Sequence, residues 1–347
     1  EKFHRILKAY QDNNVDEFNK LVEEYDTYFD SLLLSDYEPS KVRLELFYHF
    51  SSPLFQALIF YGIAALFVVV SWVFYGVALN DLGLSVQRAA MIVLAIGGLI
   101  HTIGITERII ITGKAPVTNL YASSVFISWG SVVCGFLIDL IVSYASPKSS
   151  KLGIGTLLGA LMGFFVIMVS FNLALRSDTF EKVEAVLDTQ FWLATHVVCV
   201  TFGYVATFVA GALGLAFLCG SAFSPLFDKE LRKGLSHIIY GIVCFALLLS
   251  FFGTVLGGLW ADDSWGRFWG WDPKENGALL IVIWNALILH ARWGGMIKER
   301  GLAILALGGN VVTCWSWFGV NELGVGLHSY GFTDGLLSIL FGIAVAH

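Results

Sequence analysis

A stretch of thirteen residues, from Trp260 to Asp272, contains five large aromatic rings. Scattered tryptophans in a membrane protein usually form an interfacial belt, because their amphipathic rings favour the headgroup region. That explanation fits the dense string WGRFWGWDPKE poorly. The glycines in the string let the backbone turn and come close to another molecule, and rings such as Trp265, Trp269 and Trp271 offer a rigid apolar wall. We therefore predict that this segment binds a large flat cofactor.

The end of the string favours the start of a helix and carries positive charge. Asp272 is a good N-cap and Pro273 suits the first helical turn, so we expect a helix that begins near Lys274. Arg267 and Lys274 lie beside the rings and could meet carboxylates of the cofactor, such as the propionates of a haem.

Two of the eight histidines, His196 and His328, could bind iron beside these rings. His196 is expected in the first turns of a helix, within roughly 8 Å of its end at 1.5 Å per residue. His328 is expected in a loop before the last apolar segment. Neutral imidazole nitrogens are axial ligands of haem iron. One such histidine is more often only an interfacial polar residue. Counting the crossings puts both histidines on the same side of the membrane as the tryptophan segment, and this favours a bis-imidazole haem site.

A third histidine, His290, falls inside an apolar segment, about 21 Å from the helix end nearest the tryptophans. An ionisable residue within the bilayer is a functional hypothesis by default. The neighbouring Arg292 and Trp293 equally favour a simple anchor at the membrane interface. His101, midway along another apolar segment, raises the same question, and its neighbouring threonines favour a structural role.

Composition indicates that membrane-spanning helices position these residues. Apolar residues make up 56% of the 347 positions and charged residues 14%, and the mean hydropathy is +0.73. Soluble chains are usually about 45–50% apolar and about 25% charged. Runs of roughly 20 apolar residues can span a bilayer, and in lipid each must be a helix to satisfy its backbone. Nine such runs occur, at about 54–79, 88–112, 120–145, 152–172, 191–221, 236–260, 277–296, 301–320 and 331–346.

The predicted fold is therefore all-α, a polytopic transmembrane helical bundle of about eight or nine helices. Residues 1–50 differ, because charged and apolar residues alternate there in an amphipathic helical pattern typical of a soluble segment. We expect two parts, an external helical segment at 1–50 and a transmembrane domain at 51–347 with the tryptophan loop at 260–276. The net charge of −6 argues against nucleic acid as a partner.

Basic residues in the short loops predict the orientation in the membrane. One set of loops holds nine basic residues and the other six, and the second set is also the more acidic. We place the first set in the cytoplasm, so the N-terminal segment and the loops at 173–190, 261–276 and 321–330 are expected outside. The first set consists of Arg88, Lys148, Lys151, Lys229, Arg232, Lys233, Arg292, Lys298 and Arg300.

Four stretches together resemble one family. The run WGRFWGWDPKENGALLIVIWNALILHARWGG is similar to the WWD domain of the CcsA (ResC) proteins of cytochrome c biogenesis. GKAPVTNLYASSVFISWG at 113–130, FWLATHVVCVTFGY at 191–204 and VNELGVGLHSYG at 320–331 also resemble that family. The likeness covers roughly residues 50–347 in the same order, which makes it more specific than a count of tryptophans.

The resemblance implies a haem-handling subunit of a membrane cytochrome c synthase. In that family haem b, the substrate, crosses from the cytoplasm and is held outside, where its vinyl groups meet the reduced thiols of a CxxCH segment on apocytochrome c. A thioredoxin-like protein would keep those thiols reduced. By matching motif, His196 and His328 would be the external ligands of the haem iron, His290 a ligand within the membrane, and Trp265, Trp269, Trp271 and Asp272 part of the external platform.

The resemblance also implies a partner and a location. The family's complete synthase includes a second half, CcsB (ResB), either fused or separate, which is expected to supply the second ligand for a haem at His290 unless His101 substitutes. The loop at Gly113 reads GKAP, where many relatives resemble GHFP. The expected location is the bacterial inner membrane, or the thylakoid membrane for a plastid protein.

Two other classes of function remain open on the sequence. A haem exporter or chaperone of the CcmC or CcmF type would share the tryptophan loop without forming the thioether bond. An unrelated transporter with an aromatic gate would need neither haem nor paired histidines.

Overall fold

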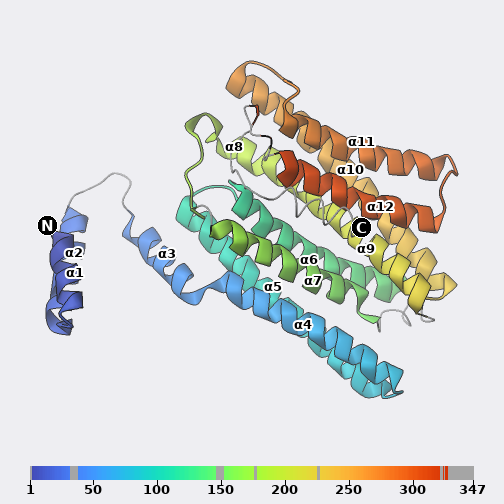
Figure 1. Cartoon of the computed structure of the whole chain (residues 1–347), viewed down its shortest axis with the longest axis horizontal. Helices are drawn as coiled ribbons and strands as arrows, with labels where there is room; N and C mark the ends of the chain where they lie inside the picture. Colours follow the sequence, from blue (N-terminus) through green and yellow to red (C-terminus); the bar gives the residue numbers. More distant parts are fainter. Residues whose placement is uncertain are drawn as a thin grey trace. The chain divides into compact units, whose positions relative to one another are not determined.

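The computed structural model describes residues 2–31, 38–145, 152–175, 178–224 and 227–320, together with 323, 325 and 326. All regular structure in these ranges is helical, as predicted (Figure 1). His328 and the last predicted span, 331–346, lie outside the described residues. The chain divides into two compact units, Glu1–Ser51 and Ser52–His347.

The first unit contains α1 (Lys2–Gln11), α2 (Val15–Ser31) and α3 (Pro39–Ser51). Ile6 and Ala9 of α1 pack against Leu21 of α2, with Phe18 and Tyr25 beside them. The charged residues of both helices lie on the opposite, exposed faces, as the amphipathic pattern predicts.

The second unit is a bundle of helices, all of them long except the three-residue α8. They are α4 (Pro53–Gly76), α5 (Asn80–Thr112), α6 (Leu120–Ala145), α7 (Ile154–Ala174), α8 (Gln190–Trp192), α9 (Val198–Phe223), α10 (Lys229–Trp265), α11 (Pro273–Trp293) and α12 (Glu299–Cys314). Three short segments complete it: the 3₁₀ turn η2 (Ala185–Leu187) and the π-helical turns η3 (Leu193–Val197) and η4 (Trp315–Gly319). Residues 190–223 form one continuous helix through α8, η3 and α9.

Within the described ranges, seven helical segments are long and apolar enough to cross a membrane. The chain is a polytopic α-helical membrane protein. The predicted span 277–296 is helical in α11, but α11 is not among the seven because polar residues interrupt it, including Asn285 and His290. The number of crossings therefore stays a prediction.

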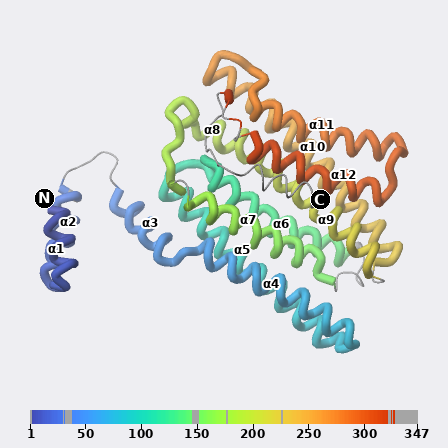
Figure 2. The backbone as a smooth tube through the Cα atoms, in the orientation of Figure 1, coloured from blue at the N-terminus to red at the C-terminus, as the bar shows by residue number. Residues whose placement is uncertain are grey.

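The helices pack in neighbouring pairs (Figure 2). α4 lies along α5 and α7, α6 lies along α7, and α9 contacts α10 and α12, while α11 covers α10 and α12. Large apolar side chains such as Leu66, Phe165 and Leu248 are more than half exposed on the outside. A surface of that kind is unfavourable in water and suits contact with lipid.

The α6–α7 pair is closely packed and joined by one carboxylate. A Cβ added at Gly135 would lie 2.9 Å from the Cα of Gly159, so only glycine allows this approach. Asp139 of α6 accepts hydrogen bonds from the backbone N–H groups of Gly155 and Thr156, both at 2.7 Å, and from the Thr156 hydroxyl at 2.5 Å. The side chain of one helix thus caps the first turn of the next.

Replacing Asp139 by Ala should lower the stability of the bundle, because three donors in a partly buried place lose their acceptor. We expect the free energy of unfolding to fall by about 1–3 kcal/mol, measured by thermal unfolding in detergent and followed by circular dichroism. The matched control is Asp228→Ala, which removes an N-cap with a single bond to Leu231 N at 2.8 Å. Equal losses in the two variants would contradict the role given to Asp139.

Candidate functional site

The tryptophan loop is held between two well-defined helix ends. α10 ends at Trp265, and Gly266 closes it in the left-handed conformation (φ 67°) with its N–H donating to Asp262 O. α11 begins at Pro273 with Asp272 as its N-cap, one residue earlier than the sequence suggested. The cap predicted from Asp272 and Pro273 is therefore confirmed.

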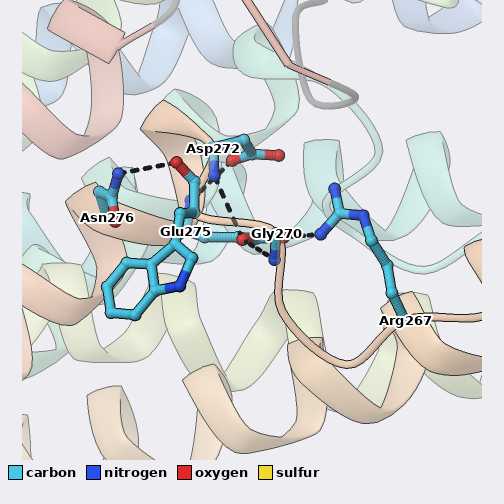
Figure 3. Close-up of polar contacts among 6 residues, drawn as sticks. Arg267, Gly270, Asp272, Glu275 and Asn276 are labelled. Carbon is cyan, nitrogen blue, oxygen red and sulfur yellow. Dashed lines mark hydrogen bonds and ion pairs between the residues drawn. The ribbon is translucent and has the colours of Figure 1, made fainter.

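The side chain of Glu275 organises the loop (Figure 3). Its Oε2 accepts hydrogen bonds from Gly270 N at 2.7 Å and from Asp272 N at 3.3 Å, and its Oε1 pairs with Arg267 Nη1 at 3.0 Å. In the other direction, Glu275 N donates to Asp272 Oδ1 at 2.9 Å, which completes a capping box. Glu275 was not among the site residues predicted from the sequence, although the spacing D-P-K-E is the signature of this box.

The tryptophans of the loop differ in their contacts and in their exposure. Trp269 and Trp271 meet edge to face, with centroids 5.9 Å apart and planes at 85°. Trp271 has φ 58°, a left-handed conformation that costs energy for a large side chain, and the residue is 69% exposed. Asn276 Nδ2 donates to Trp271 O at 2.9 Å and helps to hold it there. The Arg267 guanidinium lies 5.9 Å from the centroid of Trp265.

His196 approaches α10 at the end from which the loop departs. It lies in the π-helical turn η3, and such turns often mark functional positions. Its Nδ1 lies 2.7 Å from Gly253 O, and its ring meets Trp260 at a centroid distance of 5.6 Å. Because a carbonyl only accepts, Nδ1 carries the proton, and the neutral ring has its lone pair on Nε2. This is the tautomer that a metal ligand bound through Nε2 requires.

Small residues on α10 make room for these aromatic side chains. A Cβ at Gly257 would lie 2.5 Å from the His196 ring, and a Cβ at Gly258 would lie 2.5 Å from the ring of Phe268. Neighbouring positions near the end of α10 therefore contact both His196 and Phe268 of the tryptophan loop.

Lys274 forms hydrogen bonds with the second π-helical turn, η4. The Nζ of Lys274 donates to Ser316 O at 3.3 Å and to Trp317 O at 3.1 Å, carbonyls at a helix C-terminus that favour a cation. Lys274 lies outside the seven spanning segments, and burial lowers its pKa to about 8, opposed by the nearby Asp272. Its charge is thus directed toward η4, whereas Arg267 stays 31% exposed in its side chain. Of the two suggested propionate partners, Arg267 is the better placed.

The described part of the segment before His328 also reaches this site. Gly326 has φ 95°, and a Cβ added there would lie 2.7 Å from the Cβ of Asp272. His328 itself lies outside the described residues, two positions further along the sequence.

His290 and His101 are placed apart from the loop. His290 is exposed near the far end of α11, with Nδ1 bonded to Ala286 O at 2.9 Å and its ring beside Trp293. His101 is completely buried, and its Nδ1 lies 3.0 Å from the hydroxyl of Tyr61. The neighbouring Thr102 and Thr106 donate to backbone carbonyls instead. The hydrogen-bond partner of the buried His101 is therefore Tyr61, and not the threonines that were expected.

Among the described residues, no three histidine, cysteine, aspartate or glutamate side chains gather as a metal-binding group. A haem iron needs only one or two protein ligands, because the macrocycle supplies the other four. The geometry around His196 and the loop fits such a group, since it combines an oriented imidazole, exposed aromatic surface and an Arg side chain.

Comparisons with known proteins show the family to which the chain is similar. A family model described as cytochrome C assembly protein matches residues 117–328. NrfI of Wolinella succinogenes is 32% identical over 246 residues, which is 68% of this chain but only 25% of NrfI. CcsA of Prochlorococcus marinus (strain MIT 9312) is 27% identical over 315 residues, 81% of this chain and 98% of that protein. CcsA of Parasynechococcus marenigrum is 29% identical over 273 residues, 70% of this chain and 86% of that protein.

Fold and site together define a polytopic helical membrane protein with a tryptophan-rich loop between two helices and an oriented histidine beside the end of the first of them. The chain belongs to the cytochrome c assembly protein family, since the family model covers more than half of its length. Its CcsA relatives place it in cytochrome c biogenesis, in a family that handles haem.

Replacing Glu275 by Ala should loosen the tryptophan loop. The amides of Gly270 and Asp272 then lose their acceptor, and we expect them to exchange hydrogen roughly tenfold faster, because a bond to a charged group contributes about 1.5–3 kcal/mol. Hydrogen–deuterium exchange of the peptide covering 266–272 measures this. Glu230→Ala, at the exposed first turn of α10, is the control and should leave the loop unchanged. Unchanged exchange in Glu275→Ala would contradict the organising role.

Proposed function

We propose that this chain holds haem at the tryptophan loop, with His196 and His328 as axial ligands of the iron, and presents it for attachment to apocytochrome c. The observation that carries this proposal is the orientation of His196. Gly253 O and Trp260 fix the ring at the end of α10 from which the loop departs, in the tautomer with its lone pair on Nε2. Gly326, two residues before His328, lies against Asp272 and supports the pairing of the two histidines at this loop.

The loop residues would supply the remaining contacts. Trp265, Trp269 and Trp271 offer aromatic surface for the flat macrocycle, and the strained, exposed Trp271 is the ring best placed to meet a ligand. Asp272 acts through the backbone, as the cap that fixes the loop. Arg267 keeps donors available beyond its bond to Glu275 and would meet a propionate.

The chemistry of attachment demands positioning from the protein. Each cysteine thiol of a CxxCH segment adds across a vinyl double bond, so that a carbon–sulfur bond forms and the thiol hydrogen goes to the other vinyl carbon. The addition involves no net oxidation or reduction, but both cysteines must be thiols before it starts, and a thioredoxin-like reductant would keep them so. Holding the haem edge beside the peptide supplies proximity and orientation, and no nucleophile is required from this chain.

A complete synthase would also include a CcsB-like partner subunit. His290 is exposed on α11 and His101 is buried against Tyr61, so the second ligand of a haem at His290 would come from a CcsB-like partner. NrfI is about four times as long as the segment that it shares with this chain, which supports the presence of further domains beside a segment of this type. We place the assembly in the bacterial inner membrane, or in the thylakoid membrane of a plastid, with the loop and residues 1–50 on the outer side.

A haem exporter or chaperone would share the same loop without forming the thioether bond. Reconstitution distinguishes the two functions. If cytochrome c matures when this chain and its partner half are the only additions, the chain serves a synthase. If haem is bound and passed on but no thioether forms, it is a haem handler.

Removing the imidazole of His196 should reduce haem binding. We expect His196→Gly to lower the haem content of the purified protein about tenfold or more, and added imidazole to restore much of it by filling the vacated space. The haem-to-protein ratio is measured by the pyridine haemochrome assay. His237→Gly, an exposed histidine toward the other end of α10, is the control and should retain haem. Normal haem content in His196→Gly would refute the assignment.

A further inference from the structure

A pocket lined by basic side chains lies at the opposite end of the bundle from the tryptophan loop. Its volume is about 480 Å³, and its lining consists of Phe217, Arg232, Arg292, Lys298, Glu299 and Arg300. These residues come from the end of α9, the start of α10, the end of α11 and the start of α12. A cavity of this size is in the usual range for small-molecule sites, roughly 300–1,000 Å³.

The pocket carries excess positive charge. It has four cations and one carboxylate, and within the described ranges none of the four cations forms an ion pair. Arg232 Nε and Arg292 Nη1 donate to the backbone carbonyls of Asp228 and Ile297, both at 3.3 Å, which hold the side chains without neutralising them. Such a concentration of unpaired cations favours an anionic ligand.

The start of α12 adds a second feature that attracts anions. Lys298 is its N-cap residue, and no side chain caps the N–H groups of the first turn, to which Glu299 and Arg300 belong. Uncapped N–H groups and the helix dipole together favour a phosphate or a carboxylate. Phe217, only 1% exposed, gives the same pocket an apolar wall.

The surroundings of the pocket resemble a membrane–water interface. Trp293 Nε1 donates to the Tyr240 hydroxyl at 2.9 Å, and tryptophan and tyrosine are enriched at that level. Trp293 is 65% exposed and Met296 81% exposed, so apolar surface adjoins the cationic lining. A ligand that matches both has an anionic headgroup and an apolar tail.

We propose that this pocket binds the phosphate of an anionic phospholipid headgroup, such as phosphatidylglycerol. Basic pockets between helices at a membrane surface are suited to such headgroups. The site is separate from the one proposed for haem. His290 stands two residues before Arg292, about 200° around the helix, so a ligand in the pocket does not share the face that carries His290. The proposal therefore stands independently of the proposed haem function.

The test is lipid binding by the full chain in detergent. Purified protein is stripped of lipid and titrated with dioctanoyl phosphatidylglycerol, with the matching phosphatidylcholine, or with inorganic phosphate, and bound molecules are counted by native mass spectrometry. We expect phosphatidylglycerol to be retained and phosphatidylcholine to be lost. K298Q/R300Q, which changes two exposed residues, should weaken phosphatidylglycerol binding about tenfold.

The control variant K229Q/K233Q removes two exposed charges from the same end of α10, outside the pocket, and should bind like the original protein. R232Q/R292Q provides a second test from the other side of the pocket, and it should lower binding as K298Q/R300Q does. Equal binding of the two lipids, or equal losses in the control and pocket variants, would overturn the proposal. Competition by inorganic phosphate at the lipid's own concentration would also overturn it, since the site would then serve a soluble anion.

Discussion

The tryptophan loop depends on one buried carboxylate. Glu275 is 8% exposed and would be costly to bury unpaired, so the chain around it satisfies both oxygens. Two loop amides and Arg267 converge on it, while Asp272 closes the capping box from the other side. The same bonds that start α11 therefore fix the backbone that displays the rings. Trp271 can be kept in an unfavourable conformation because the loop around it is fixed.

A second constraint acts from α10. Gly257 and Gly258 leave room for the rings of His196 and Phe268 to approach the backbone of that helix, and Gly253 leaves room for Val200. The carbonyl of Gly253 then orients the imidazole. The loop leaves the end of α10 against which the π-helical turn η3 places His196, and Lys274 at the start of α11 donates to carbonyls of the second π-helical turn, η4. Neither the loop nor the histidine forms the site by itself.

Much of the fold could be predicted because the bilayer leaves few alternatives to helices. The spans 54–79 and 120–145 agree with α4 and α6 to within three residues. α10 begins seven residues before the predicted 236, since its charged first turns carry no apolar pattern. α11 is helical as predicted but too polar to be assigned as a span by composition. The cap at Asp272 was predictable from local chemistry.

Contacts between distant residues were not predictable in the same way. Counting the predicted crossings put His196 on the same side of the membrane as the loop, but its bond to Gly253 O depends on how α10 packs against the helix that carries His196. Lys274 looked free to meet a ligand, whereas folding directs it toward η4. His101 was expected to bond its neighbours along the helix, and its partner proved to be Tyr61, forty positions away.

Under the proposed function, one haem is held by two imidazoles at the tryptophan loop. Electron paramagnetic resonance of the oxidised, haem-loaded protein tests it most directly, because the spin state reports the axial ligands. We expect a low-spin signal typical of bis-histidine ligation, which is lost in His196→Gly and recovered with imidazole. A high-spin signal in the unaltered protein, or a low-spin signal that persists unchanged in His196→Gly, would contradict it.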